Sequence, residues 1–160
     1  MLLLLIRHAQ AAEQNDAEFP DDSLRPLVPK GRKVQRRMSR LLVKHDCVPN
    51  RVFSSPWKRA WQTARIVVEE TGIGTKNRIR CDALAEPPDL AALAREIGEI
   101  GGEETIGLVG HEPWMGALAA ELLVGSSSGL RIDFSKSGVL GIETDGFEPG
   151  EGTLRFFWTP

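Results

Sequence analysis

The chain has 160 residues, a length that fits one folded domain over residues 1–160. Its apolar content of 41% and charged content of 26% are those of an ordinary globular protein, which excludes a disordered or fibrous chain. The formal net charge of -2 provides no overall attraction to nucleic acid or to a membrane, so we expect neither as a partner.

The two cysteines, Cys47 and Cys81, stand far apart and form no Cys-x-x-Cys pair. This spacing argues against a disulfide framework and a structural zinc site, and we expect core-filling thiols, no metal and no cofactor. Free thiols are typical of a reducing compartment. The apolar run at residues 1–6 is too short for a signal peptide or a membrane span, so we expect a cytoplasmic protein.

In chain order, the first predicted element is a strand at residues 2–6, whose continuous apolar sequence is typical of a parallel strand covered on both faces. After a polar loop at residues 9–29, Val34, Met38 and Leu41 recur at helical spacing. The other face of that helix carries five basic residues: Arg32, Lys33, Arg36, Arg37 and Arg40. This face is either a solvated surface or an electrostatic guide for an anionic substrate or partner.

The next predicted elements are a strand at residues 51–54 and a helix that Gly72 closes. Ser55 is predicted as the N-cap of this helix, with Pro56 in its first turn. Further patterns predict a strand at Ile79 and Cys81, a helix at 90–97, a strand at 105–109, a helix at 115–123, and a hairpin of strands at 139–142 and 154–158.

This order of elements predicts an α/β fold, with a mostly parallel sheet and a C-terminal antiparallel hairpin in a three-layer α/β/α sandwich. Ligands of open parallel sheets bind at the carboxyl ends of the strands. Three stretches with suitable side chains follow predicted strands: Arg7-His8, Ser54-Ser55-Pro56 with Arg59, and Gly110-His111-Glu112-Pro113. We therefore expect them at one rim of the sheet.

These residue types suit phosphate chemistry. A neutral imidazole can attack phosphorus, and an arginine fork binds two phosphate oxygens at once. A protonated second histidine would donate to the developing charge. Each stretch alone has a structural explanation, as a loop histidine or a helix cap, and only their combination at three strand ends favours a function. His45 ends the basic helix, where a cation suits the dipole, so we do not place it in the site.

The same stretches resemble those of a known family. Leu4–Ala9 resembles the RHG motif of the histidine phosphatase (phosphoglycerate-mutase-like) superfamily, with Ala9 in place of the usual glycine. Ser54–Ala64 is similar to the block whose arginine after Ser-Pro binds phosphate, and Val109–Pro113 to the block with the second histidine. Arg25-Pro26-Leu27 followed by Gly31 resembles the short SixA-type phosphohistidine phosphatases, which have no large inserted cap.

The resemblance implies roles for particular residues. His8 would be the nucleophile, and the phosphoryl oxygens would be bound by four residues: Arg7, Arg25, Arg59 and His111. Glu86 stands where the short branch often has a glutamate and is the candidate general acid. It is equally well explained as a carboxylate favoured by the start of a helix.

The leading expectation is a metal-independent phosphatase that hydrolyses phosphohistidine on a partner protein through a covalent phospho-His8 intermediate and releases inorganic phosphate. A phosphoramidate needs less acid assistance than an ester, which agrees with the uncertain role of Glu86. The alternatives are a small-molecule phosphomonoesterase or mutase of the same superfamily, and a non-catalytic phosphate-dependent binding protein.

Overall fold

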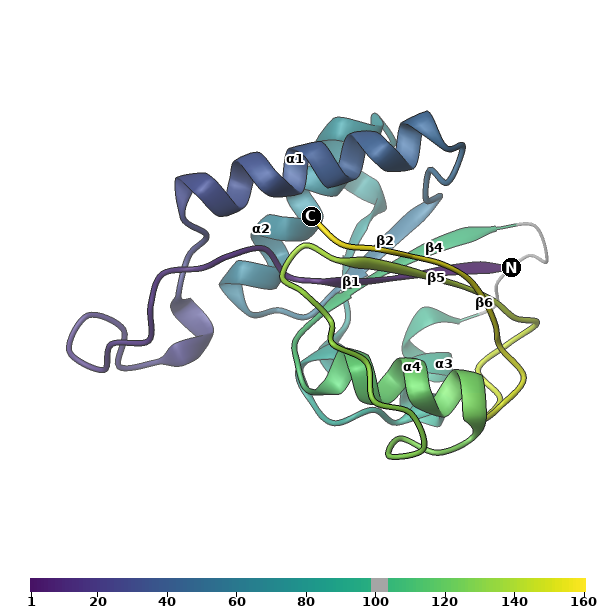
Figure 1. Ribbon diagram of the computed structural model, residues 1–160. Coiled ribbons are helices and arrows are strands. Elements are labelled where there is room, and N and C mark those ends of the chain that lie inside the picture. The colour runs from purple at the N-terminus through teal and green to yellow at the C-terminus, as the bar shows by residue number, and fades with distance from the viewer. Residues whose placement is uncertain (99–103) are drawn as a thin grey trace.

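A sheet of six strands with helices on both faces forms the frame of the protein, which a computed structural model describes over residues 1–98 and 104–160 (Figure 1). The strands are β1 (Leu2–Arg7), β2 (Arg51–Ser54), β3 (Arg78–Arg80), β4 (Thr105–Gly110), β5 (Val139–Glu143) and β6 (Thr153–Trp158). The helices are α1 (Pro29–Lys44), α2 (Lys58–Thr71), α3 (Leu90–Ile97) and α4 (Trp114–Val124). Short 3-10 turns are η1 (Asp22–Leu24), η2 (Thr75–Asn77) and η3 (Asp82–Ala85).

The strand order is β3-β2-β4-β1-β5-β6. The β1–β4, β2–β4 and β2–β3 pairs are parallel, whereas β5 is antiparallel to both β1 and β6. Figure 1 shows α1 and α2 on one face of this sheet and α3 and α4 on the other. The predicted α/β fold with a C-terminal antiparallel hairpin is therefore confirmed.

The central strand β1 explains why the N-terminal run is apolar without interruption. Successive side chains of a strand point to opposite faces, and both faces here are covered by helices. Leu3 and Leu5 belong to the core under α3 and α4, and Leu4 and Ile6 to the core under α1 and α2. All four side chains are fully buried, and each contributes roughly 1.5–3 kcal/mol by leaving water.

The start of α2 differs from the sequence prediction. The helix begins at Lys58, and Trp57 rather than Ser55 occupies its N-cap position, without a side-chain capping bond. The chain instead bends at residues 55–57, where the Ser55 hydroxyl accepts a 3.3 Å hydrogen bond from the Trp57 N–H. The prediction of Ser55 as a helix cap is wrong because this bend delays the helix. Gly72 ends α2 in the left-handed region, at φ 74°, as predicted.

Both cysteines are free thiols. Cys81 lies directly after β3 and is fully buried in the core under α3, and burial is the main cause that raises its pKa to about 12. Cys47 is half-buried against the core under α1. In the part of the chain that the structure describes, no helix is long and apolar enough to cross a membrane.

The segment after β1 projects beyond the end of that strand and then returns to start α1 (Figure 1). Its two arms pair through an Ala11–Leu27 bridge, and the Val28 N–H donates to the Gln10 carbonyl at 3.1 Å. Gly31 makes this return possible, since a Cβ there would lie 2.2 Å from the Gln10 oxygen. The close approach ties the first turn of α1 to the residues that follow His8.

We expect Gly31→Ala to lower the free energy of unfolding by about 2–4 kcal/mol, because backbone atoms must move to admit the methyl group. Urea denaturation measures the change. The matched control is Gly146→Ala, since a Cβ at Gly146 meets nothing within 4 Å. We expect that control to stay within about 0.5 kcal/mol of wild type. Equal stability of the two variants would contradict the close packing at Gly31.

Candidate active site

His8 stands immediately after β1, where its backbone N–H still donates to the Gly110 carbonyl at 3.0 Å. Its side chain is only 7% exposed. The ring Nδ1 lies 2.7 Å from the Ala9 carbonyl oxygen, and the ring Nε2 lies 3.3 Å from Nε of Arg59. A carbonyl can only accept and a guanidinium can only donate, so these partners assign the proton to Nδ1 and leave a lone pair on Nε2.

The surroundings of His8 keep its ring neutral. Burial is the main cause that lowers the pKa of His8 to about 3, and the charges of Arg59, Arg7 and Lys136 act in the same direction. The hydrogen bond to the Ala9 carbonyl opposes this shift. Near neutral pH the imidazole is therefore an uncharged base with an available lone pair, which is the form that a nucleophile requires.

The Arg59 guanidinium comes from the first turn of α2 and is 4% exposed. Besides His8, it donates from Nη1 to the Asp22 backbone oxygen at 2.7 Å and from Nη2 to the Asp22 carboxylate at 3.0 Å. Its plane also lies over the Trp57 ring, 4.5 Å from the centroid. Asp22 thus supplies the counter-charge for a buried cation and fixes the direction in which the guanidinium points.

Arg25 joins the same group through Asp22. Its Nε is 2.6 Å from the second oxygen of the Asp22 carboxylate, and its Nη1 donates to the Ala12 carbonyl at 2.7 Å. Hydrogen bonding to Arg25 is the main cause that lowers the pKa of Asp22. One carboxylate in the turn η1 therefore bridges two of the three arginines expected in the site.

Arg7, the third expected arginine, is the last residue of β1 and directly precedes His8. Its Nη1 donates to the Phe134 carbonyl at 2.5 Å, while its buried Nε has no hydrogen-bond partner among the described residues. Burial is the main cause that lowers the pKa of Arg7, and the nearby acids Glu112 and Asp133 oppose this effect. Arg7 is close enough to His8 for its charge to act on that ring.

His111 follows β4 and is 3% exposed. Its ring centroid lies 5.1 Å from that of His8 and 4.7 Å from that of Trp57. The ring Nε2 is 2.8 Å from the Ser55 hydroxyl, whereas the buried Nδ1 has no partner within the described residues. Burial is the main cause that lowers the pKa of His111 to about 3, followed by the proximity of His8.

Four residues that contact the predicted site residues had no role predicted for them in the site: Asp22, Ser55, Trp57 and Thr63. Thr63 accepts the Ala9 N–H at 3.0 Å and donates to the Arg59 carbonyl at 2.7 Å, which fastens the chain after His8 to α2. The side chain of Ala9 is itself fully buried, packed in a small cluster with Ala11, Leu27 and Ile66. A methyl group is therefore accommodated where the family usually has glycine.

Among the described residues, Glu86 makes no hydrogen bond or ion pair with either histidine, so its role as general acid stays a prediction. Glu86 is exposed and lines a neighbouring groove of about 600 Å³ together with Pro56 and Trp57. Trp57 is the link between this groove and the site, because its ring packs on His111. His45, which we left out of the site, ends α1 and packs against Trp158 at 5.0 Å instead.

The arrangement defines a class of protein: an α/β fold whose parallel strands carry a neutral imidazole, a second histidine and arginines at their carboxyl ends. The sequence model of the histidine phosphatase superfamily (branch 1) matches residues 3–86. The chain belongs to this superfamily, and its membership supports a phosphatase.

Relatives agree with this assignment. The chain is 27% identical to the phosphohistidine phosphatase SixA of Escherichia coli over 172 aligned positions, covering 100% of this chain and 94% of the relative. It is 28% identical to an uncharacterised protein of a Picosynechococcus strain, covering 90% of this chain and 86% of that protein.

Solved structures show the same fold. The structure of the protein histidine phosphatase SixA complexed with tungstate superposes with a TM-score of 0.83 at 26% identity, covering 100% of this chain and 97% of the other. A phosphohistidine phosphatase SixA homologue from Agrobacterium tumefaciens superposes with a TM-score of 0.76 at 24% identity, covering 99% and 97%.

We expect Asp22→Asn to lower the free energy of unfolding in phosphate-free buffer by about 1–3 kcal/mol, because a buried guanidinium loses its counter-charge. Added inorganic phosphate should raise the melting temperature of this variant more than that of wild type, since the dianion restores the lost charge. Thermal unfolding with and without phosphate measures both effects.

The matched control is Asp82→Asn, which removes an exposed carboxylate paired with Arg80 at 2.7 Å. We expect this control to change stability by less than about 0.5 kcal/mol and to leave the phosphate effect as in wild type. A phosphate effect on Asp22→Asn no larger than on wild type would contradict an anion site in which Asp22 neutralises Arg25 and Arg59.

The two histidines also predict a pH dependence of stability. Their pKa values of about 3 lie below the 6.5 of an ordinary histidine, so the unfolded chain binds more protons between these values. The free energy of unfolding therefore falls as the pH falls through this window, by up to about 1.4 kcal/mol per pH unit for each histidine.

We expect the free energy of unfolding of His8→Asn to fall less steeply than that of wild type between about pH 6.5 and 4.5, measured by urea denaturation. His45→Gln, at an exposed position, should keep the wild-type slope. Parallel curves for wild type and His8→Asn would contradict a neutral buried His8.

Proposed function

We propose that this protein is a phosphatase that removes phosphate from phosphohistidine on a partner protein, with His8 as the nucleophile. The observation that carries this proposal is the His8 ring itself: Nδ1 is held by the Ala9 carbonyl, and the Nε2 lone pair meets the Arg59 guanidinium. Such an imidazole is prepared to attack an electrophile whose negative charge the same guanidinium can bind.

In the first step, Nε2 of His8 forms a bond to phosphorus while the bond between phosphorus and the substrate imidazole breaks. If the other nitrogen of that imidazole already carries a proton, the ring leaves as neutral imidazole, and no acid is required. The Arg59 Nε–H, which meets Nε2 in the free protein, is then available to a phosphoryl oxygen. Phosphoryl transfer depends mainly on such positioning and charge stabilisation.

In the second step, the hydrogen bond between Nδ1 and the Ala9 carbonyl becomes important. Phospho-His8 carries phosphorus on Nε2 and a proton on Nδ1, so its ring is a cation. Water attacks phosphorus and loses a proton to solvent, the bond to Nε2 breaks, and His8 departs as the neutral ring from which it started. The products are inorganic phosphate and regenerated enzyme.

Two further groups support an oxyanion at this site. Nδ1 of His111 and Nε of Arg7 are buried polar atoms without a hydrogen-bond partner among the described residues. Buried nitrogens of this kind normally have a partner, and a bound phosphoryl group would supply acceptors. Its negative charge would also raise the pKa of His111, so that this ring could take up a proton and donate. Arg25 would add positive charge beside the phosphoryl group, because it pairs with the same Asp22 carboxylate as Arg59.

Phosphohistidine on a protein is the preferred substrate for two reasons. A relative aligned along the whole chain is named as a phosphohistidine phosphatase. The expected general acid Glu86 is exposed in the neighbouring groove, and a phosphoramidate can be cleaved without it. The second candidate, a phosphomonoesterase or mutase for small molecules, would need Glu86 to protonate the leaving oxygen.

We expect His8→Ala to lower the rate of phosphate release from a phosphohistidine peptide by at least about a thousandfold, because no other described group replaces the nucleophile. Wild type exposed to radiolabelled phosphoramidate should carry an acid-labile label, and His8→Ala should carry none. Scintillation counting after rapid quenching in alkali measures the label, and an enzyme-coupled phosphate assay at neutral pH measures turnover.

The same assay should include glycerate and sugar phosphates. Faster turnover of these esters than of the phosphohistidine peptide would favour the phosphomonoesterase. Tight phosphate binding by wild type without any label or turnover would indicate a phosphate-dependent binding protein instead. Near-normal turnover by His8→Ala would contradict the proposed mechanism.

A further inference from the structure

Helix α1 carries an unusual concentration of positive charge. Its 16 residues include no acidic side chain and seven basic ones: Lys30, Arg32, Lys33, Arg36, Arg37, Arg40 and Lys44. The whole chain has 20 basic and 22 acidic residues, so this helix departs strongly from the average. A local positive field of this kind attracts an anionic partner even though the net charge of the protein is slightly negative.

Part of this charge is neutralised within the protein. Arg36 and Arg40 both pair with Glu70 of α2, at 3.5 and 2.7 Å. Lys33, Arg37 and Lys44 are exposed and have no acidic partner among the described residues. These three cations are therefore available to carboxylates of another molecule.

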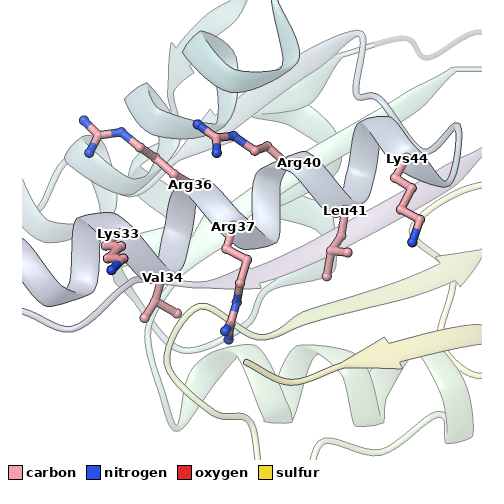
Figure 2. A pocket seen from close by; sticks show the side chains of 7 residues that line it. All are labelled: Lys33, Val34, Arg36, Arg37, Arg40, Leu41 and Lys44. Carbon is pink, nitrogen blue, oxygen red and sulfur yellow. The ribbon is translucent and has the colours of Figure 1, made fainter.

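The available cations surround an apolar floor. A groove of about 590 Å³ along α1 is lined by five basic residues and by Val34 and Leu41. Figure 2 shows Val34, Arg37 and Leu41 along one side of the helix, whereas Arg36 and Arg40 leave it on the other side. Val34 and Leu41 are two turns apart, roughly 10 Å along the axis, and both are half-buried against the core below. The groove thus offers two apolar contacts between cations.

The groove begins close to the candidate active site. The first turn of α1 packs against Gln10 through Gly31, and Arg32 donates to the Gln62 side chain at 3.2 Å. Gln62 also accepts the Leu27 N–H, two residues after Arg25. The start of α1 is therefore tied by direct contacts to the segment that follows His8 and Arg25.

The surface beyond Trp57 has the opposite charge. The groove that contains Glu86 is lined by four acidic residues: Asp82, Glu86, Asp89 and Glu96. An acidic partner is repelled there and attracted along α1, so the two grooves together give it one orientation.

We infer that the α1 groove docks an acidic, partly apolar segment of the phosphoprotein substrate, with its leucine-type side chains on Val34 and Leu41 and its carboxylates on Lys33, Arg37 and Lys44. This inference rests on the proposed function, since it names the partner of the same site. The apolar floor favours a protein over a nucleic acid, because the lining offers no aromatic side chain on which a base could stack.

The test uses two synthetic phosphohistidine peptides that are alike except for one property. One carries leucine and glutamate residues beside the phosphohistidine, and the other carries glutamine in place of each glutamate. We expect wild type to prefer the acidic peptide by about tenfold in kcat/KM, as several exposed ion pairs would give. Lys33→Glu with Arg37→Glu should abolish this preference while leaving kcat/KM for phosphoramidate within about twofold.

The matched control is Lys76→Glu with Arg95→Glu, which reverses two exposed basic residues outside α1 and should preserve the preference. The inference is overturned if wild type shows no preference, or if the preference survives in the α1 variant. It is also overturned if single-stranded DNA inhibits peptide turnover more strongly than the unphosphorylated acidic peptide does.

A binding measurement separates this inference from the proposed function. Fluorescence anisotropy of the unphosphorylated acidic peptide reports docking without turnover. If neither phosphohistidine nor phosphoramidate is hydrolysed, but this peptide still binds wild type and not the α1 variant, the proposed function fails and the docking groove stands.

Discussion

The chemistry at this site depends on a buried guanidinium that is held from one side and directed at an imidazole on the other. Asp22 binds Arg59 through both its carboxylate and its backbone oxygen, while Nε of Arg59 meets Nε2 of His8. A cation so little exposed is tolerated only with a compensating charge and a full set of hydrogen bonds. Burial is the main cause that lowers the pKa of His8, and the charge of Arg59 acts in the same direction, so the cation that orients the ring also favours its neutral form.

The strand order of the sheet brings the residues of this site together. β4 lies between β2 and β1, so the ends of these three strands are neighbours although the residues are distant in the chain. Ile6 pairs with Val109, and Ser54 pairs with the same Val109 from the other side. The residues that follow these positions are consequently brought together by the register of the backbone, before any side-chain interaction is considered. The apolar run of β1 secures this register because both of its faces are buried.

Much of this was predictable from the sequence, and the parts that were not share a physical reason. The buried strands, the helices between them and the hairpin follow from apolar periodicity. The meeting of the three stretches at one edge of the sheet follows from the rule that ligands of parallel sheets bind at the carboxyl ends of the strands.

Asp22 was missed because a carboxylate in a polar loop shows no periodicity, and its partners lie elsewhere in the chain. Ser55 was assigned to a helix cap because Ser-Pro is a strong local signal, whereas its hydroxyl contacts His111, a partner set by the tertiary structure. The role of Glu86 came from the resemblance alone, and the structure places its exposed side chain in the groove that Trp57 also lines.

The distribution of charge around the pocket follows from the same construction. The site concentrates arginines around a ring that must remain neutral, so additional cations close to His8 would lower its basicity further. Under the proposed function, a phosphorylated partner is better attracted by cations placed at a distance, where solvent screens their effect on His8. Helix α1 fits this arrangement, because it begins against the segment after His8 and its axis carries Lys33, Arg37 and Lys44, which have no acidic partner in the described part of the chain. The proposed docking surface and the proposed nucleophile are thereby separated in space, although the first turn of α1 packs against Gln10, two residues after His8.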